Sequence, residues 1–230
     1  MRLDKFLCEM NIGTRSQVKD YIRRGEVTLN SREVKSPDMK IDENNDKICF
    51  RGIEIVFEKY VYYMLNKPAG VVSATKDNTA DTVLSLIEGA SKKGLFPMGR
   101  LDKDTEGILI ITNDGELAHR LLSPKNHVDK TYLVQTALPV SSEAAAWLES
   151  GVDIGDDRLT APAKVKILSD SHILLTIHEG RFHQVKRMLK AVDNGAVGLK
   201  RISFGNLELD KKLKPGESRR LTDREVELLN

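Results

Sequence analysis

The feature that most constrains this chain is a continuous run of four branched apolar residues at 108–111. Gly107 precedes the run, and Asn113, Asp114 and Gly115 follow it. This length and composition predict a strand buried inside a sheet. Strand-like and helical segments elsewhere mix without a regular βαβ alternation. We therefore expect an α+β fold whose sheet is mixed and mainly antiparallel.

Local patterns predict the other elements of the longer, C-terminal part of the chain. Strands are expected at 61–65, 131–134, 164–168 and 172–177, and helices at 82–87, 116–122, 143–148 and 182–192. A capping box, Thr222 with Glu225, predicts one more helix near the C-terminus. Residues 59–230 are thus expected to form one larger domain.

The first 58 residues have the pattern of a separate small domain with two helices and a short sheet. The first helix is predicted from the i, i+3, i+4, i+7 spacing of Leu3, Phe6, Leu7 and Met10. Gly13 ends it, and a Thr14–Gln17 capping box starts a second helix at about 15–24. Segments 27–29 and 33–34 then flank a turn and predict a hairpin.

Charge is sorted within this small domain. Residues 1–35 hold eight Lys and Arg against five Asp and Glu, whereas residues 36–58 hold three against six. Arg15, Lys19 and Arg23 fall at i, i+4, i+8 and share one helix face. Such a row of cations can meet a phosphate backbone, although an ordinary solvated helix face has the same spacing.

Composition excludes several classes of protein. No apolar run approaches the roughly 20 residues that span a bilayer, and the N-terminus lacks the apolar region of a secretion signal. Two cysteines supply neither a disulfide framework nor a zinc site. No P-loop, Gly-x-Ser-x-Gly or His-Glu-x-x-His motif is present. We expect a reduced, cytoplasmic protein that does not enter a membrane.

The charged loop at 99–107, directly before the buried strand, is a candidate for catalysis or binding. Asp102, Asp104 and Glu106 place three carboxylates within five residues. A rigid strand holds such side chains in place while leaving them accessible. The group could bind Mg²⁺ or Ca²⁺, but it lacks the length and ligands of an EF-hand loop. A charged surface loop without a chemical role has the same spacing, so that alternative stays open.

A second segment, residues 179–190, predicts an amphipathic helix with a basic face. Its apolar side is expected to hold Phe182, Val185, Met188, Leu189 and Val192, and its basic side His183, Lys186, Arg187 and Lys190. No acid occurs from 180 to 192, so no partner within the helix neutralises these cations. The face therefore suggests an anionic partner, although a solvated helix is the commoner case.

These segments resemble the pseudouridine synthases of the RsuA type over essentially the full length. The matching stretches are MRLDKFL at 1–7, MLNKP at 64–68, GRLDKDTEGILIITNDG at 99–115, KTYLV at 130–134, EGRFHQVKRM at 179–188 and KPGESRRLT at 214–222. The N-terminal domain resembles an S4 RNA-binding module. The resemblance favours RNA as the partner of the basic stripe at Arg15, Lys19 and Arg23.

The resemblance implies that the chain isomerises a uridine in RNA to pseudouridine without metal or cofactor. Asp102 would be the essential catalytic group, Tyr132 would stack near the base, Lys186 would be the basic partner, and Arg100 would help to hold the flipped nucleotide. A cation beside Asp102 favours its ionised form. Further RNA contacts are expected from residues of the same motifs, namely Lys67, Leu101, Arg181, His183, Gln184 and Arg187.

The expected partner is ribosomal RNA, most specifically uridine 516 of 16S rRNA. The stretch TAPAKV at 160–165 and the C-terminal spacing favour this small-subunit target. Two alternatives stay open: a sister enzyme acting on 23S rRNA, and a noncatalytic S4 protein that binds RNA during ribosome assembly. A monomer is expected because no long apolar stripe is left unassigned.

Overall fold

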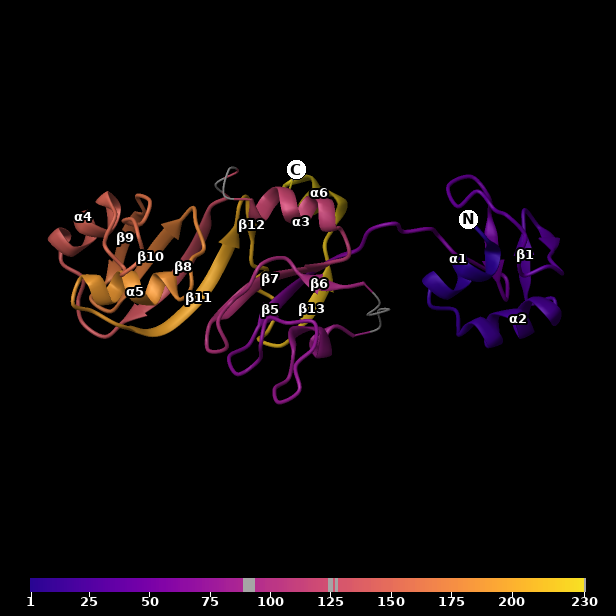
Figure 1. Ribbon diagram of the computed structural model, residues 1–230, viewed down its shortest axis with the longest axis horizontal. Coiled ribbons are helices and arrows are strands. Elements are labelled where there is room, and N and C mark those ends of the chain that lie inside the picture. The colour runs from indigo at the N-terminus through magenta and orange to yellow at the C-terminus, as the bar shows by residue number, and fades with distance from the viewer. Residues whose placement is uncertain (89–93, 124–125, 127, 230) are drawn as a thin grey trace. The chain divides into compact units, whose positions relative to one another are not determined.

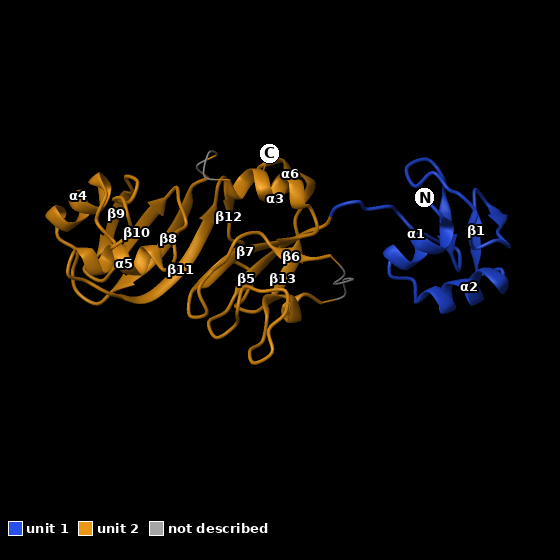
Figure 2. Ribbon diagram, in the orientation of Figure 1, with its two compact units in different colours: residues 1–60, 89–93 blue, residues 61–88, 94–230 orange. Residues whose placement is uncertain are grey.

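The computed structural model describes residues 1–88, 94–123, 126 and 128–229. Among these, Met1–Tyr60 form one compact unit, and 61–88 with 94–229 form a second (Figure 2). Each unit has its own sheet. The division falls close to the expected boundary at residue 58.

The N-terminal unit packs two helices against a four-stranded antiparallel sheet. Its elements are α1 (Leu3–Glu9), α2 (Arg15–Arg23), β1 (Val27–Leu29), β2 (Arg32–Glu33), β3 (Ile48–Phe50) and β4 (Ile53–Glu54), with strand order β2-β1-β3-β4. Thr14 and Gln17 form the predicted capping box at the start of α2. The predicted apolar face of α1 is buried through Leu3, Phe6 and Leu7. These residues and their neighbours form a core confined to this unit.

The C-terminal unit is built on one nine-stranded sheet. Its strands are β5 (Tyr62–Lys67), β6 (Phe96–Pro97), β7 (Glu106–Thr112), β8 (Lys130–Thr136), β9 (Lys164–Ser169), β10 (His172–Ile177), β11 (Ala196–Phe204), β12 (Leu207–Glu208) and β13 (Ser218–Arg220). The main order is β13-β5-β7-β11-β8-β10-β9, with β12 beside β11 and β6 beside β7. Of these pairings, only β7 with β11 is parallel. The expected α+β fold with a mainly antiparallel sheet is confirmed.

The helices of this unit are short: α3 (Gly115–Leu122), α4 (Ser142–Ser150), α5 (Gln184–Ala191) and α6 (Asp223–Glu227). Figure 1 shows α3 and α6 beside the β5–β7 half of the sheet, and α4 and α5 beside the β8–β10 half. Leu117 of α3 and Leu229 after α6 pack with Met64, Ile108 and Ile110. The helix expected at 82–87 is a 3₁₀ turn, η1 (Val83–Leu86). No helix in the described part of the chain is long and apolar enough to cross a bilayer.

The nine-residue strand β11 was not anticipated from the sequence. Figure 1 shows it running from the β8–β10 half of the sheet to the β5–β7 half. Its register shifts twice against β8, between Ala196 and Gly198 and again between Arg201 and Ser203. Each irregularity breaks the two-residue alternation by which strands are recognised. The strand is therefore defined by its neighbours, β7 and β8.

Candidate active site

The loop that carries Asp102 is folded around a buried ammonium group. Lys67 is fully buried, and its Nζ donates to the carbonyl oxygens of Pro68 (3.0 Å), Asp102 (3.0 Å), Lys103 (3.2 Å) and Thr105 (2.8 Å). Burial lowers the pKa of Lys67 to about 8. Lys67, which was expected to contact RNA, has no exposed surface here, and its ammonium group is bound by the backbone of this loop.

A close backbone approach sets the loop beside Tyr132. In the sheet, Arg201 of β11 lies opposite Gly107 on one side and opposite Tyr132 on the other. Gly107 has φ +104°, and a Cβ there would lie 2.1 Å from the carbonyl oxygen of Arg201. Only glycine fits this position. Strand β11 therefore lies between Tyr132 of β8 and the start of β7, and it fixes the spacing between them.

Helix α5 brings two further groups to Asp102. Lys186 Nζ lies 3.4 Å from one carboxylate oxygen of Asp102, and His183 Nε2 lies 3.6 Å from the other. The sequence expectation paired Asp102 with Lys186, and the two side chains do meet. The contact joins segments more than 80 residues apart in the chain.

Lys186 also contacts a second carboxylate. Its Nζ donates to Asp104 at 2.6 Å, closer than to Asp102. The hydrogen bond from Lys186 holds the pKa of Asp104 below its usual range. The side chain of Asp104 is 71% exposed, whereas that of Asp102 is 28% exposed. The more sheltered carboxylate thus shares its cation with a solvated one.

Asp102 and several of its neighbours line one pocket, whereas Lys67, Lys186 and Arg187 do not. Of the residues expected to act on or bind substrate, the pocket is lined by Arg100, Leu101, Asp102, Tyr132, Arg181, His183 and Gln184. Sequence reasoning missed five other lining residues, namely Thr105, Ile177, Gly180, Val185 and Leu199. The Thr105 hydroxyl is buried and has no hydrogen-bond partner among the described residues. Among those residues, no three His, Cys, Asp or Glu side chains converge as metal ligands.

Polar side chains around the start of α5 are bound by groups outside the helix. Arg181 contacts Glu179 at 3.0 Å and Asp156 at 3.4 Å, and it donates to the carbonyls of Arg158 and Leu159. Gln184 is buried and donates to Glu179 at 2.8 Å.

Arg187 is engaged in the same way, since it donates to the Ile154 carbonyl and pairs with Asp156. The expectation of unneutralised cations is wrong at Lys186, which pairs with Asp104, and at Arg187. A search confined to residues 180–192 cannot detect an acid at position 156.

The expected helix at 182–192 begins two residues later than predicted. His183 has φ +48° and precedes α5 as its N-cap. Phe182, expected on the apolar face, is 75% exposed. Because the left-handed residue reverses the chain before the helix, Phe182 is turned outward instead of packing with Val185.

The cationic stripe of the N-terminal unit is solvent-exposed. Arg15, Lys19 and Arg23 all lie on α2 with exposed side chains. Arg23 pairs with Asp20 at 2.8 Å. Arg15 and Lys19 have no carboxylate within ion-pair distance among the described residues. The stripe therefore keeps most of its charge available to a partner.

Comparisons with known proteins agree with this architecture. The profile of the RNA pseudouridylate synthase family matches residues 61–191, and that of the S4 domain matches residues 1–47. A crystal structure of a pseudouridylate synthase superimposes with a TM-score of 0.72 at 42% identity and covers 100% of both chains.

Full-length relatives carry the same description. An uncharacterized RNA pseudouridine synthase of Bacillus subtilis is 45% identical over 235 residues, covering 100% of this chain and 98% of the relative. The ribosomal small subunit pseudouridine synthase A of Haemophilus influenzae is 43% identical, with 100% and 99% covered, and that of Escherichia coli is 38% identical, with 98% of each covered.

The chain therefore belongs to the RNA pseudouridine synthase family, and it is an enzyme that isomerises uridine to pseudouridine in RNA. Its N-terminal unit is an S4 RNA-binding domain. Within the family it is of the RsuA type, as the GRLD and HQVKRM motifs predicted.

Proposed function

We propose that this enzyme modifies 16S rRNA of the small ribosomal subunit, at uridine 516, and that Asp102 is its catalytic group. The names of the full-length relatives from Haemophilus influenzae and Escherichia coli support the small-subunit target. The expected cytoplasmic location and monomeric state stay predictions.

One observation carries the catalytic proposal: Asp102 lines a pocket together with Arg100 and Tyr132, while Lys186 and His183 lie at its carboxylate. An ammonium group at this distance attracts the negative charge of a carboxylate, and a carboxylate can act as nucleophile or base. The pocket opens at the surface, so a uridine that has left its stack can enter it. Tyr132 supplies an aromatic ring to contact the base.

The reaction is redox-neutral. The bond between N1 of uracil and C1′ of the ribose breaks, the freed base turns, and C5 bonds to C1′. The proton on C5 leaves, and N1 gains one, so the product has the mass of the substrate. The two routes open to Asp102 are attack on C1′ and attack on the ring, and both need the same ionised carboxylate.

Asp102→Asn tests the catalytic proposal. The amide keeps the shape of the side chain but lacks the negative charge, so turnover should fall by about 10³-fold or more while RNA binding persists. Pseudouridine formed in 16S rRNA from a deletion strain is measured by carbodiimide modification and primer extension. Turnover at the wild-type rate would remove Asp102 from catalysis.

The target is tested in the deletion strain itself. Both 16S and 23S rRNA are mapped for pseudouridine before and after the gene is restored. Loss and recovery at position 516 of 16S rRNA is the expected result. Loss at a 23S position would favour the sister-enzyme alternative, and an unchanged map would overturn both ribosomal targets. The noncatalytic alternative is set aside by the family membership. The grouping of Asp102, Tyr132 and Lys186 also speaks against it, since a protein that only binds RNA needs no such carboxylate.

The cationic stripe on α2 is proposed as a phosphate-binding surface of the S4 domain. Replacing Arg15, Lys19 and Arg23 by Gln should weaken RNA binding and lower the slope of log Kd against log salt by about 2. Lys47→Gln is the control, because that exposed ammonium already pairs with Glu54 at 2.8 Å. An unchanged slope in the triple variant would remove the stripe from the interface.

A further inference from the structure

Phe182 is an exposed aromatic residue beside the pocket. It is 75% exposed, the same fraction as Ile53 of the small unit. Its ring stacks on His183 with centroids 3.9 Å apart and planes 16° from parallel. One face of the Phe182 ring is therefore covered, and the opposite face is open to solvent.

His183 lies between the Phe182 ring and the proposed catalytic carboxylate of Asp102. It lines the pocket, and its Nε2 lies 3.6 Å from Asp102. Phe182 itself does not line the pocket, but the imidazole on which its ring stacks does. A flat group placed against the open face would continue the stack outward from the pocket.

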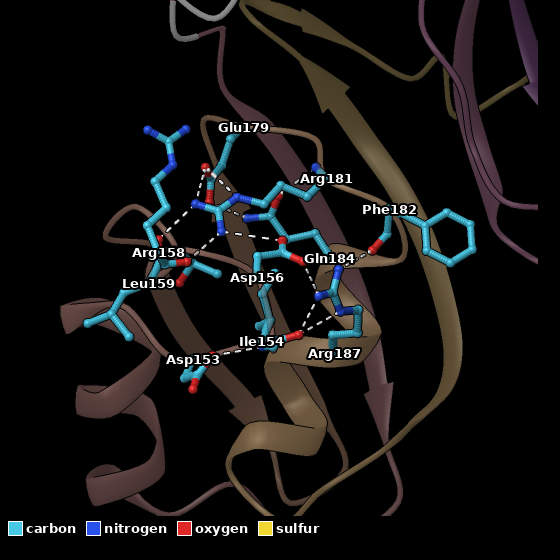
Figure 3. Close-up of polar contacts among 12 residues, drawn as sticks. Asp153, Ile154, Asp156, Arg158, Leu159, Glu179, Arg181, Phe182, Gln184 and Arg187 are labelled. Carbon is cyan, nitrogen blue, oxygen red and sulfur yellow. Dashed lines mark hydrogen bonds and ion pairs between the residues drawn. The ribbon is translucent and has the colours of Figure 1, made fainter.

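The backbone of Phe182 is fixed by a polar cluster. Arg187 Nη1 donates to the Phe182 carbonyl at 3.0 Å, while its other nitrogens are held by the Ile154 carbonyl and Asp156. Figure 3 shows this cluster with the Phe182 ring pointing away from it. The hydrogen bond from Arg187 also lowers the pKa of Asp156, so the pair stays charged at neutral pH.

A fixed aromatic ring with an open face suits a nucleobase. Bases of unpaired RNA stack on aromatic side chains, and every base has a π face. A ring that is already ordered loses little freedom when the base arrives. When a uridine leaves its helix, the bases next to it lose a stacking partner.

We propose that Phe182, backed by His183, is a stacking platform for a base adjacent to the uridine that enters the pocket. The inference rests on the proposed entry of an unstacked uridine at Asp102. It adds a residue that holds the neighbouring RNA rather than the reacting base. Arg187 is a positioning residue, which acts by fixing the Phe182 backbone.

Kinetics distinguish this role from a merely structural one. Phe182→Ala should raise KM for a 16S rRNA transcript about tenfold with little change in kcat, since the lost contact is to a non-reacting base. Phe182→Trp should keep KM at or below the wild-type value because a larger ring stacks at least as well. Leu138→Ala is the control, an exposed apolar residue that does not line the pocket.

Fluorescence tests the stacking without relying on turnover. Trp147 is the only tryptophan, so Phe182→Trp combined with Trp147→Phe leaves a single reporter at position 182. Its emission should be quenched when the same 16S transcript binds, and Trp147 in the wild-type protein should respond much less. The fluorescence experiment measures RNA binding and not turnover. It therefore tests whether a base stacks at position 182 even if the enzyme modifies a different RNA.

The outcomes separate the two proposals. If the wild type forms pseudouridine and Phe182→Ala has unchanged KM, the platform is overturned while the proposed function stands. An absence of quenching at position 182 on RNA binding also overturns it and points to a protein partner for the exposed ring. If the wild type modifies neither 16S nor 23S transcripts, the target assignment fails, and quenching still decides the platform.

Discussion

Lys186 lies between two carboxylates of unequal exposure. It is 2.6 Å from the solvated Asp104 and 3.4 Å from the more sheltered Asp102. Ion pairs to exposed groups contribute little, because water and salt screen them. The shorter distance therefore does not identify the more important partner, and the two contacts are separable by mutation.

Lys186→Met and Asp104→Asn should have very different effects. Without the ammonium, Asp102 loses its main counter-charge, and kcat should fall by about 10²-fold or more. Asp104→Asn frees Lys186 for Asp102 and should leave kcat within about fivefold of wild type. Both are measured by the rate of pseudouridine formation in the same RNA. Equal losses in the two variants would show that the ammonium serves the loop as a whole and not Asp102.

At the scale of elements, the last strand, β13, and the last helix, α6, are joined through the guanidinium group of Arg219. Arg219 of β13 pairs with Glu225 of α6 at 2.8 Å and with Asp210 at 2.7 Å. Glu225 also accepts from the backbone of Thr222, which completes the predicted capping box. These bonds lower the pKa of Glu225 to about 2, and the hydrogen bond from Arg219 is the largest cause. Helix α6 is thus joined to β13 by this ion pair, in addition to the packing of Leu229 in the core.

Glu225→Gln should reduce the pH dependence of stability in acid. The carboxyl has a lower pKa in the folded than in the unfolded protein, so its contribution is complete above about pH 5 and is lost as pH falls toward 2. The variant should lose up to about 3 kcal/mol at pH 6 and about half of that at pH 3. Urea titrations at several pH values measure this. Glu227→Gln, in the same helix but exposed, is the control, and a gap between wild type and Glu225→Gln that does not vary with pH would contradict the linkage.

At the scale of the whole molecule, each of the two units has a core of its own among the residues that the structure describes. One is built on Leu3, Phe6 and Leu7 with the small sheet, and the other on Met64 and Ile108 with their neighbours. A unit of about 60 residues buries a smaller share of its surface than one of about 160, so its stability is expected to be lower. The S4 domain and the catalytic domain should therefore unfold as distinct cooperative units.

Hydrogen exchange followed by mass spectrometry tests this division. Leu7→Ala removes a buried side chain at a cost of about 3 kcal/mol and should speed exchange across the S4 domain, β1 and β3 included, but not in the catalytic domain. Leu175→Ala, equally buried in β10, should speed exchange in the catalytic domain and leave β1 and β3 unchanged. If either variant accelerated exchange in both domains equally, the two cores would form one cooperative unit.

Sequence alone determined the features that depend on near neighbours. Capping boxes at Thr14 and Thr222, the apolar face of α1 and the buried strand at 108–111 all follow from residues within a few positions of one another. The RsuA-type motifs likewise fixed the family, because each is a short contiguous stretch. Within such short stretches, the spacing of apolar and capping residues along the chain is enough to predict which side chains are buried and which cap a helix.

Only the tertiary structure decided which charged side chains are exposed to solvent and which are bound by other groups of the protein. The ammonium group of Lys67 is hydrogen-bonded to backbone carbonyls of the loop at 102–105. Arg187 is bound by a loop about 30 residues earlier in the chain. Phe182 is exposed because His183, which follows it, has a left-handed conformation. Strand β11 exists because β7 and β8 flank it. These outcomes depend on contacts between residues far apart in the chain, and the energy of a charge is set by whatever group folding brings beside it.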